Sequence, residues 1–368
     1  MRRIYLDHNA TCPLRAEARA ALVAALESAS GNPGSAHAEG RAARRVLEDA
    51  RERLAAALGA GRDEVVFTSG GTESNALALS AAGGGLVLHS PIEHPSVLKP
   101  LAARGGARAL PVDGWGRVAP GAPAGAQAAL VSVALANNET GVVQDVAALA
   151  RTAHAQGALL HCDASQALGK WPLSFRDLAA DLLTLSAHKV GGPVGVGALL
   201  VRKGTPLSPL LLGGEQEDGL RAGTEAAALA AAFAAAAEAA LRELPQAAPR
   251  WRAWVAELRA GLPRLAPEAH FNSPEDAVLP NTLSVSFAGR AGAVLVQRMD
   301  LEGVALSSGS ACSSGAQRPS PVLLALGADE RRARGALRFS FGPANSDSDA
   351  QETLARLARV LRDVPPRA

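Results

Sequence analysis

The feature that most constrains this chain is an alternation, between residues 64 and 202, of short apolar runs with longer segments that can form helices. The apolar runs lie at 65–67, 86–88, 129–135, 158–160, 182–185 and 197–201, and each predicts a buried strand. Helices are expected between several of them, at Ser74–Ala82, Pro95–Arg104 and Val146–Gln156. This order is typical of βαβ units around a mostly parallel sheet. Residues that directly follow the runs should meet at the carboxyl edge of that sheet, where such folds bind ligands.

The pattern changes after Thr224. An alanine-rich segment from Glu225 to Leu244 predicts one helix, and an amphipathic stretch from Trp251 to Leu265 predicts a second. Further strands are expected at Thr282–Phe287 and Ala336–Phe341, with helices at 291–301 and about 347–362. We therefore expect an α/β fold with a large domain over residues 15–245. Residues 1–14 and 246–368 are expected to form a smaller α+β domain.

Composition narrows the classes of function. The net charge of +2 over 368 residues gives no broad electrostatic basis for binding nucleic acid. The three cysteines (Cys12, Cys162 and Cys312) are too few and too scattered for a disulfide framework, which favours a reducing compartment. The N-terminus lacks a secretory apolar region, and no apolar run reaches the length that spans a membrane. We expect a cytoplasmic protein without direct contacts to nucleic acid or membrane.

The strongest local signal is the segment Ser186–Lys189, which follows the apolar run 182–185. Its position places Lys189 at the carboxyl end of a buried strand, where a free ammonium ion is costly to bury. An imine with an aldehyde cofactor removes that cost, and lysine is the residue that forms one. A lysine whose ammonium reaches solvent at the mouth of the strand is the alternative interpretation.

Asp163 follows the apolar run 158–160 and should lie at the same edge of the sheet. A pyridoxal ring needs a carboxylate at its pyridine nitrogen, whereas an ordinary N-cap of the next helix would also use an aspartate. A metal site built from His154, His161, Cys162 and Asp163 is disfavoured, because adjacent residues of a strand point to opposite faces. No metal is expected.

The segment Phe67–Ser74 runs from a strand through two glycines into a helix. Free amide groups and the helix dipole at such an N-terminus favour a bound phosphate. The segment matches neither the P-loop nor the dinucleotide-binding pattern, which argues against a nucleotide. Ser186 and His188 are candidates for two further phosphate donors.

An ordered set of motifs, spread over nearly the whole chain, resembles the cysteine desulfurases. The motifs are Tyr5–Thr11, Gly31–Pro33, Thr68–Asn75, Glu93–His94, Asn137–Gly141, Asp163–Gln166, Ser186–Lys189, Arg221–Thr224, Ser307–Cys312 and Arg338–Ser340. The resemblance implies a pyridoxal 5'-phosphate enzyme of fold type I, in the class-V aminotransferase group, that works as a homodimer. The long segment from Ser307 to Pro321 resembles the branch of NifS and IscS.

The resemblance also implies roles at the cofactor. Lys189 would hold the cofactor through the imine, Asp163 would pair with the pyridine nitrogen, and His94 would stack on the ring and move protons. Gln166 would bond the ring hydroxyl oxygen. The phosphate would be held by Gly71, Thr72, Ser186 and His188, with Thr224 from the other subunit. For His94 and Asn138, a helix cap and a turn residue are the structural alternatives.

The substrate implied is L-cysteine. Arg338 would grip its carboxylate with a two-pronged pair, and Asn138 would lie beside ring and substrate. Cys312 sits in a run of serine, glycine and alanine that is unlike a core segment, so its thiol is the candidate that takes the sulfur as a persulfide. We expect the segment from Ser307 to about Ser320 to be mobile, with Pro319 and Pro321 starting the next helix.

The implied function is a cysteine desulfurase that releases alanine and passes sulfur to an acceptor protein, such as an iron–sulfur scaffold or a thiolation enzyme. A selenocysteine lyase or another class-V aminotransferase is the nearest alternative, although an aminotransferase has no use for Cys312. A scaffold without activity would be expected to lose the set Lys189, Asp163, His94 and Cys312, which is intact here.

Overall fold

The computed structural model describes residues 2–123, 125, 127–309 and 318–366. Its larger sheet has seven strands in the order β2-β8-β7-β6-β5-β3-β4. These strands are β2 (Val65–Thr68), β3 (Val87–His89), β4 (Ala107–Ala109), β5 (Leu130–Ala134), β6 (Leu159–Asp163), β7 (Leu182–Ser186) and β8 (Gly197–Val201). Neighbours from β4 to β7 pair in parallel, whereas β8 runs antiparallel to both β7 and β2. The mostly parallel α/β sheet predicted from the apolar runs is confirmed.

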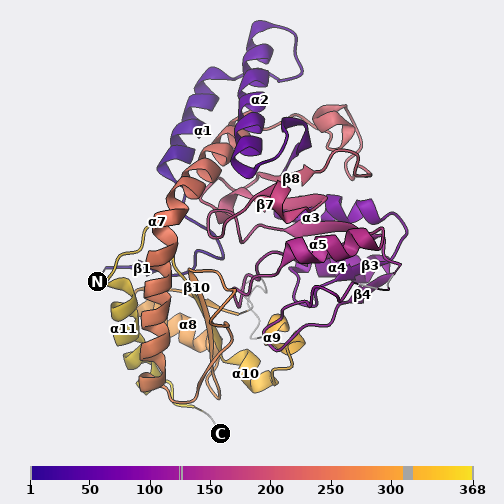
Figure 1. Cartoon of the computed structure of the whole chain (residues 1–368). Coiled ribbons are helices and arrows are strands. Elements are labelled where there is room, and N and C mark those ends of the chain that lie inside the picture. The colour runs from indigo at the N-terminus through magenta and orange to yellow at the C-terminus, as the bar shows by residue number, and fades with distance from the viewer. Residues whose placement is uncertain (1, 124, 126, 310–317, 367–368) are drawn as a thin grey trace.

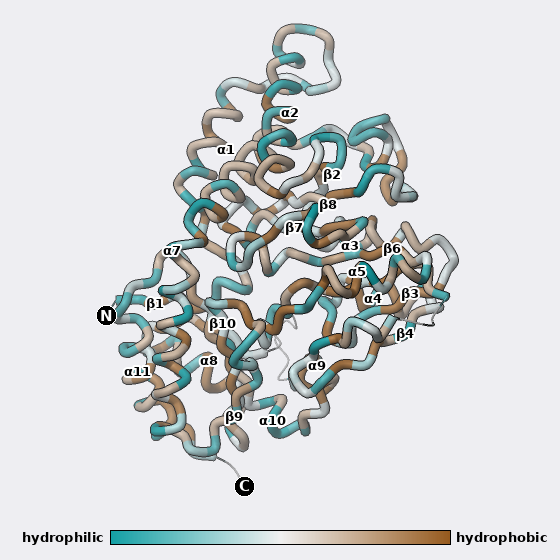
Figure 2. Tube along the Cα trace, viewed as in Figure 1, coloured by the Kyte–Doolittle hydropathy of each residue, from teal (hydrophilic) through white to brown (hydrophobic). Residues whose placement is uncertain are grey.

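Helices cover this sheet and bring its loops to one edge (Figure 1). They are α1 (Ala16–Ser28), α2 (Ala38–Leu58), α3 (Gly71–Leu79), α4 (Pro95–Arg104), α5 (Val146–Ala155) and α6 (Phe175–Leu178). The strands β6 and β7 are almost wholly buried, which explains their continuous apolar sequence. In the tube view, brown apolar segments run through the strands while the outer helices carry more teal (Figure 2). The sequence analysis assigned no elements to the segments of α1, α2 and β4.

A smaller antiparallel sheet lies toward the C-terminal part of the chain, in the order β12-β13-β10-β9. Its strands are β9 (Ala269–Phe271), β10 (Thr282–Phe287), β12 (Ser307–Ser308) and β13 (Ala336–Ser340). The helices beside it are α8 (Gly292–Leu301), α9 (Pro321–Ala325), α10 (Glu330–Arg334) and α11 (Asp349–Asp363). The N-terminal strand β1 (Ile4–Tyr5) pairs in parallel with β11 (Val304–Ala305), so the N-terminal segment packs with the C-terminal part of the chain here.

A single long helix, α7 (Ala227–Leu265), connects the two sheets along the length of the molecule (Figure 1). The sequence analysis predicted two helices in this segment, and that prediction was wrong. Leu244, Ala248 and Trp251 are buried on the second core, so packing holds the backbone helical through Pro245 and Pro249. Each proline removes only one helical hydrogen bond.

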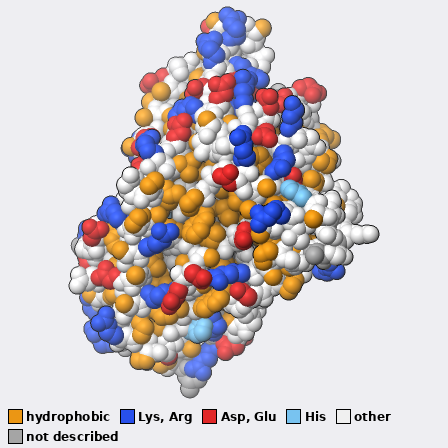
Figure 3. Space-filling view, in the orientation of Figure 1, with side chains coloured by type: hydrophobic (Ala, Val, Ile, Leu, Met, Phe, Trp, Pro, Cys, Tyr) orange, Lys and Arg blue, Asp and Glu red, His pale blue; other side chains and the backbone are white. Residues whose placement is uncertain are grey.

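The helix α7 packs into two large apolar clusters, one after the other along its length. Its alanine-rich first part packs in the core around the large sheet, and its second part packs in the core around the small sheet. These cores support a division into two domains, and the limits 15–245 and 1–14 plus 246–368 stay a prediction. Figure 3 shows hydrophobic side chains gathered over the middle of one face, between ends that carry more charge.

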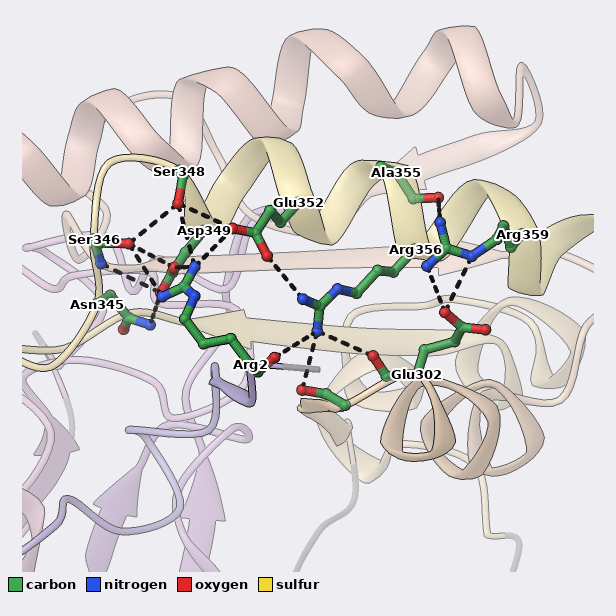
Figure 4. Close-up of polar contacts among 11 residues, drawn as sticks. Arg2, Glu302, Asn345, Ser346, Ser348, Asp349, Glu352, Ala355, Arg356 and Arg359 are labelled. Atoms are coloured by element: carbon green, nitrogen blue, oxygen red, sulfur yellow. Dashed lines mark hydrogen bonds and ion pairs between the residues drawn. The ribbon is translucent and has the colours of Figure 1, made fainter.

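Polar contacts attach α11 to the N-terminal segment (Figure 4). Arg2 pairs with Asp349 and, at 2.9 Å, with Glu352. Arg356 Nη1 donates to the carbonyl oxygens of Arg2 and Glu302, at 3.0 Å each. This network fixes the strand β1, and therefore the residues that follow it, against the small sheet. No helix within the described parts of the chain is both long and apolar enough to cross a membrane.

Candidate active site

One cavity of about 580 Å³ lies where the carboxyl ends of β6 and β7 meet the beginning of α3. Its volume suits a cofactor together with a small substrate. Ten of the predicted site residues line it: Gly71, Thr72, His94, Asn138, Asp163, Gln166, Ser186, His188, Lys189 and Arg338. The structure therefore brings together side chains from distant parts of the sequence, as the strand-end rule predicts.

Lys189 ends a short 3-10 turn that directly follows β7. Its Nζ donates to the carbonyl oxygens of Asn9 (2.8 Å) and Ala10 (2.9 Å), so the N-terminal segment fixes the amine at the cavity wall. Gly191 makes this approach possible, because its φ is +88° and a side chain there would come within 2.6 Å of Arg15. The amine is thus held at a fixed position, as a covalent attachment point requires.

Asp163 is a buried carboxylate at the end of β6. Its Oδ1 accepts from the Ser165 amide at 2.9 Å, and its Oδ2 accepts from Asn75 Nδ2 at 2.8 Å. The contact with Ser165 belongs to a local turn and caps no helix, because residues 165–170 form turns and the next helix, α6, begins with Ser174 as its cap. Both oxygens keep further lone pairs, so these contacts do not prevent pairing with a ring nitrogen in the cavity.

His94 caps the start of α4, because its Nδ1 accepts from the Ser96 amide at 3.1 Å. Nδ1 is therefore unprotonated, and the neutral ring carries its hydrogen on Nε2. Ser96 Oγ lies 2.7 Å from Nδ1 and accepts from Asn75 Nδ2 at 2.8 Å. Asn75 thus connects Asp163 with Ser96 and His94. Burial lowers the pKa of His94, and the positive charge of Lys189 lowers it further. The nearby Asp163 carboxylate acts in the opposite direction and raises this pKa.

The first turn of α3 faces the cavity with Gly71 and Thr72. Its amide groups have no acceptors inside the helix. A side chain at residue 71 would come within 3.1 Å of Ser165 Oγ and 3.4 Å of Ser186 Cβ, so glycine keeps this corner of the cavity open. His188 Nδ1 lies 3.1 Å from Thr11 Oγ1. The pKa of His188 is lowered to about 4, mainly by burial and further by the positive charges of Lys189 and Lys170.

Arg338 enters the cavity from β13 of the small sheet and is 1% exposed. Its Nη2 pairs with Asp7 Oδ1 at 2.7 Å, and its Nη1 donates to the Asn138 carbonyl oxygen at 2.9 Å. Its Nε has no hydrogen-bond partner among the described residues. A buried guanidinium with an unused donor is suited to a carboxylate ligand. Asn138 also lies in a turn, as the structural alternative expected, because Asn137 Oδ1 accepts from the amides of Glu139 and Thr140. It still lines the cavity.

Glu139 lies buried beside this turn. Its Oε2 accepts from Ser320 Oγ, and a side chain at Gly309 would come within 2.7 Å of the same oxygen. Burial raises the pKa of Glu139 to about 7, although Ser320 and Arg338 oppose the shift. Glu139 therefore lies close to Gly309, which precedes the segment 310–317, and bonds Ser320, which follows it.

Cys312 lies in that segment, outside the described residues, so its predicted role and the predicted mobility are untested. Beyond it, α9 begins at Pro321 with Ser320 as its cap, which confirms the predicted helix start. Thr224 is exposed and does not line this chain's cavity.

The donor set fits pyridoxal phosphate: a lysine, a buried carboxylate, a histidine and a helix N-terminus share one cavity. Among the described residues, no group of three or more histidine, cysteine or acidic side chains could hold a metal. The residues suspected of forming a metal site have separate partners, since His154 contacts Asp181 at 2.8 Å and His161 contacts Ser132 and Thr184.

The sequence analysis missed several residues that build the site. Asp7, Asn9 and Asn75 lay inside the quoted motifs without an assigned role, although their position in those motifs was a signal. Ser96 and Lys170 were given no role either, although each contacts a predicted site residue nearby in the sequence: Ser96 lies two residues after His94, and Lys170 lies four residues after Gln166.

Comparisons with known proteins agree with this geometry. The sequence matches the family "Aminotransferase class-V" over residues 4–352. The cysteine desulfurase IscS of Dictyoglomus turgidum is 39% identical, and the match covers 99% of this chain and 97% of that protein. A solved "NifS-like protein" superposes with a TM-score of 0.91 at 35% identity, covering 98% and 100% of the two chains. The structure of SspA in complex with cysteine gives 0.80 at 30% identity, covering 93% and 100%.

Proposed function

This chain belongs to the class-V aminotransferase family as a pyridoxal-phosphate-dependent cysteine desulfurase, and we propose that its large cavity converts L-cysteine to L-alanine. The observation that carries the proposal is the placement of Lys189 and Asp163 in one cavity with His94 and Arg338. When bound, pyridoxal phosphate supplies a ring that accepts the negative charge developed at the substrate's α-carbon.

On the sheet side, each residue acts on the cofactor. Lys189 would hold it covalently through its amine, while Asp163 would keep the ring nitrogen protonated. Gly71, Thr72, Ser186 and His188, which line the cavity, would bind the phosphate, and Gln166 would bond the ring oxygen. His94 would pack on the ring and hold or return a proton at Nε2, because its Nδ1 accepts from the Ser96 amide.

On the other side, the residues act on the substrate. Arg338 pairs with the carboxylate of L-cysteine, and Asn138 lies beside it. The Cys312 thiolate would attack the substrate sulfur and keep it as a persulfide while the bond between that sulfur and the substrate's β-carbon breaks. The electron pair of the broken bond stays with the β-carbon, which takes up a proton, so that the product is alanine. Supporting this, Glu139, next to Asn138, bonds Ser320 after the segment with Cys312 and lies beside Gly309 before it.

We further propose a homodimer in which Thr224 reaches the partner's phosphate. Leu210, Leu211 and Leu212 are exposed, the last of them by 85%, on the same connection as Thr224. An exposed apolar run of this kind supports a subunit contact. A fully active monomer would contradict the proposal.

The proposed acceptor of the sulfur is a protein, such as an iron–sulfur scaffold or a thiolation enzyme, in the cytoplasm. The cytoplasmic location is supported by Cys12 and Cys162, which are both unpaired thiols. Affinity capture from the native cell, with labelling of persulfides on the co-purified proteins, would identify the acceptor.

The test of the proposed function is Cys312→Ser. This variant should still bind L-cysteine, seen as a change in the absorption spectrum, but should form neither alanine nor sulfide. Full turnover by the variant would contradict the role of Cys312. Comparing turnover of L-cysteine with that of L-selenocysteine separates a desulfurase from a selenocysteine lyase.

A further inference from the structure

Two lysines meet on one asparagine at the floor of the cavity. Lys189 Nζ donates to the Asn9 carbonyl oxygen at 2.8 Å, and Lys170 Nζ donates to Asn9 Oδ1 at 3.2 Å. Asn9 is itself fixed, because its Nδ2 donates to Thr282 Oγ1 at 2.9 Å. The two amines are therefore held near each other by one buried residue, Lys189 on its backbone carbonyl oxygen and Lys170 on its side chain.

Lys170 is an unusual residue in its surroundings, since it is only 4% exposed. Its described hydrogen-bond partners are both amide oxygens, Asn9 Oδ1 and Gln166 Oε1, rather than carboxylates. Burying an ammonium ion without a carboxylate partner is costly. Burial accordingly lowers the pKa of Lys170 to about 8, and the charge of Lys189 contributes in the same direction.

Lys170 also determines the direction of the Gln166 amide. An ammonium group can only donate, so the atom 2.9 Å from Lys170 Nζ must be the amide oxygen of Gln166. The amide nitrogen then faces the Asn9 carbonyl oxygen, at 2.9 Å, and keeps a second hydrogen. Because Gln166 lines the cavity, this hydrogen is available to an acceptor bound there.

We propose that Lys170 is a positioning residue that acts through its charge on the amine of Lys189 and through its hydrogen bond on Gln166. This inference rests on the proposed function. The positive charge disfavours a second positive charge at Lys189, as neighbouring cations do at other amine nucleophiles. The hydrogen bond presents a donor, not an acceptor, to the ring oxygen of the cofactor.

Other charged and titratable groups face Lys170, and they stay unchanged in the test. These groups are His8, Cys12, Arg15, His188, Lys189 and Arg338. A second cavity of about 300 Å³ lies behind Lys189 and is lined by both lysines, so solvent protons have a route to them. The titration of the bound cofactor is therefore an equilibrium measurement.

The experiment compares two variants of the cofactor-loaded enzyme. Lys170→Gln removes the charge and retains an amide donor, whereas Lys170→Met removes both. We expect the pH midpoint of the cofactor's colour change to rise by about one unit in both variants. Only Lys170→Met should also release the cofactor faster, by roughly tenfold, because Gln166 loses its partner. Lys203→Met, which changes an exposed lysine, is the control.

The outcomes separate this inference from the proposed function. A wild-type protein that takes up no cofactor would overturn the proposed function. A Lys170→Gln enzyme that binds the cofactor but has the wild-type pH midpoint would overturn the inference about charge and leave the proposed function intact. If Lys170→Met does not fold, the pH midpoint of Lys170→Gln still decides the inference about charge. Lys170→Gln should release its cofactor at the wild-type rate. Faster release from Lys170→Gln than from Lys203→Met would contradict the role of the hydrogen bond.

Discussion

The two sides of the cavity are built in different ways. The sheet side takes Asp163 and Lys189 from the ends of neighbouring parallel strands, and the N-terminal segment contributes only backbone acceptors, at Asn9 and Ala10, to the Lys189 amine. The other side takes Arg338 from a separate antiparallel sheet and fixes it with Asp7 and the Asn138 carbonyl oxygen. The first side is set by strand order, whereas the second depends on how the N-terminal segment bridges the two cores. The comparison predicts that changes on the sheet side abolish chemistry and that changes on the other side weaken substrate binding.

The largest effect is expected for Lys189→Ala. Without this amine the enzyme has no covalent attachment for the cofactor, so turnover should fall below detection. Borohydride reduction and peptide mapping should find the cofactor on Lys189 in the wild type and on no lysine in the variant. Lys203→Ala is the matched control, and a label on Lys99, Lys170 or Lys203 of the wild type would contradict the assignment.

His94→Ala should lower kcat by ~10²–10⁴-fold, the usual contribution of a positioned acid–base group. The protein should keep its cofactor, because Lys189 and the start of α3 are unchanged. Steady-state rates with L-cysteine measure the effect. A variant with wild-type kcat would show that His94 is only the cap of α4.

Arg338→Lys should mainly raise KM, by roughly 10- to 100-fold, because a lysine cannot form the two-pronged pair with a carboxylate. The change in kcat should be smaller than in His94→Ala. Exposed Arg250→Lys provides the control. If Arg338→Lys instead lowered kcat with KM unchanged, the division between the two sides of the cavity would be wrong.

Ser96→Ala should lower kcat by roughly tenfold, about the effect of one lost hydrogen bond on a positioned group. It removes the hydroxyl between Asn75 and His94 but retains the Ser96 backbone amide, which donates to His94 Nδ1. Restoration of the rate by Ser96→Thr would support positioning through the hydroxyl. Equal rates for wild type and Ser96→Ala would limit Ser96 to a structural role.

Glu139 gives a prediction about stability rather than rate. Its pKa is raised in the folded protein to about 7, so the fold favours the protonated carboxyl. This contribution is complete below the pKa of the unfolded chain and is lost as the pH rises through 7. Between pH 5 and 8 the wild type should lose roughly 2–3 kcal/mol of unfolding free energy more than Glu139→Gln. Denaturant titrations measure this, with Glu257→Gln as an exposed control; parallel pH profiles would contradict it.

The sequence could predict the sheet side more fully than the other. Apolar runs locate buried strands, and the polar residue after each run then lies at a known edge, which placed Asp163 and Lys189 together. Asp7 was missed because its pair with Arg338 joins segments at opposite ends of the sequence, which no local pattern relates. Ser96 and Lys170 were missed although they lie two residues after His94 and four residues after Gln166, because these short spacings are common and carry little information by themselves. The single helix α7 was missed because burial on both cores outweighs the local effect of Pro245 and Pro249.

The most direct measurement follows the sulfur atom. Purified enzyme loaded with pyridoxal phosphate is mixed with ³⁴S-labelled L-cysteine without a reductant, and alanine and modified peptides are measured by mass spectrometry. The account predicts one alanine per active site and a heavy persulfide on the peptide that contains Cys312. Formation of alanine with the label absent from Cys312, or recovered on Cys12 or Cys162, would contradict it.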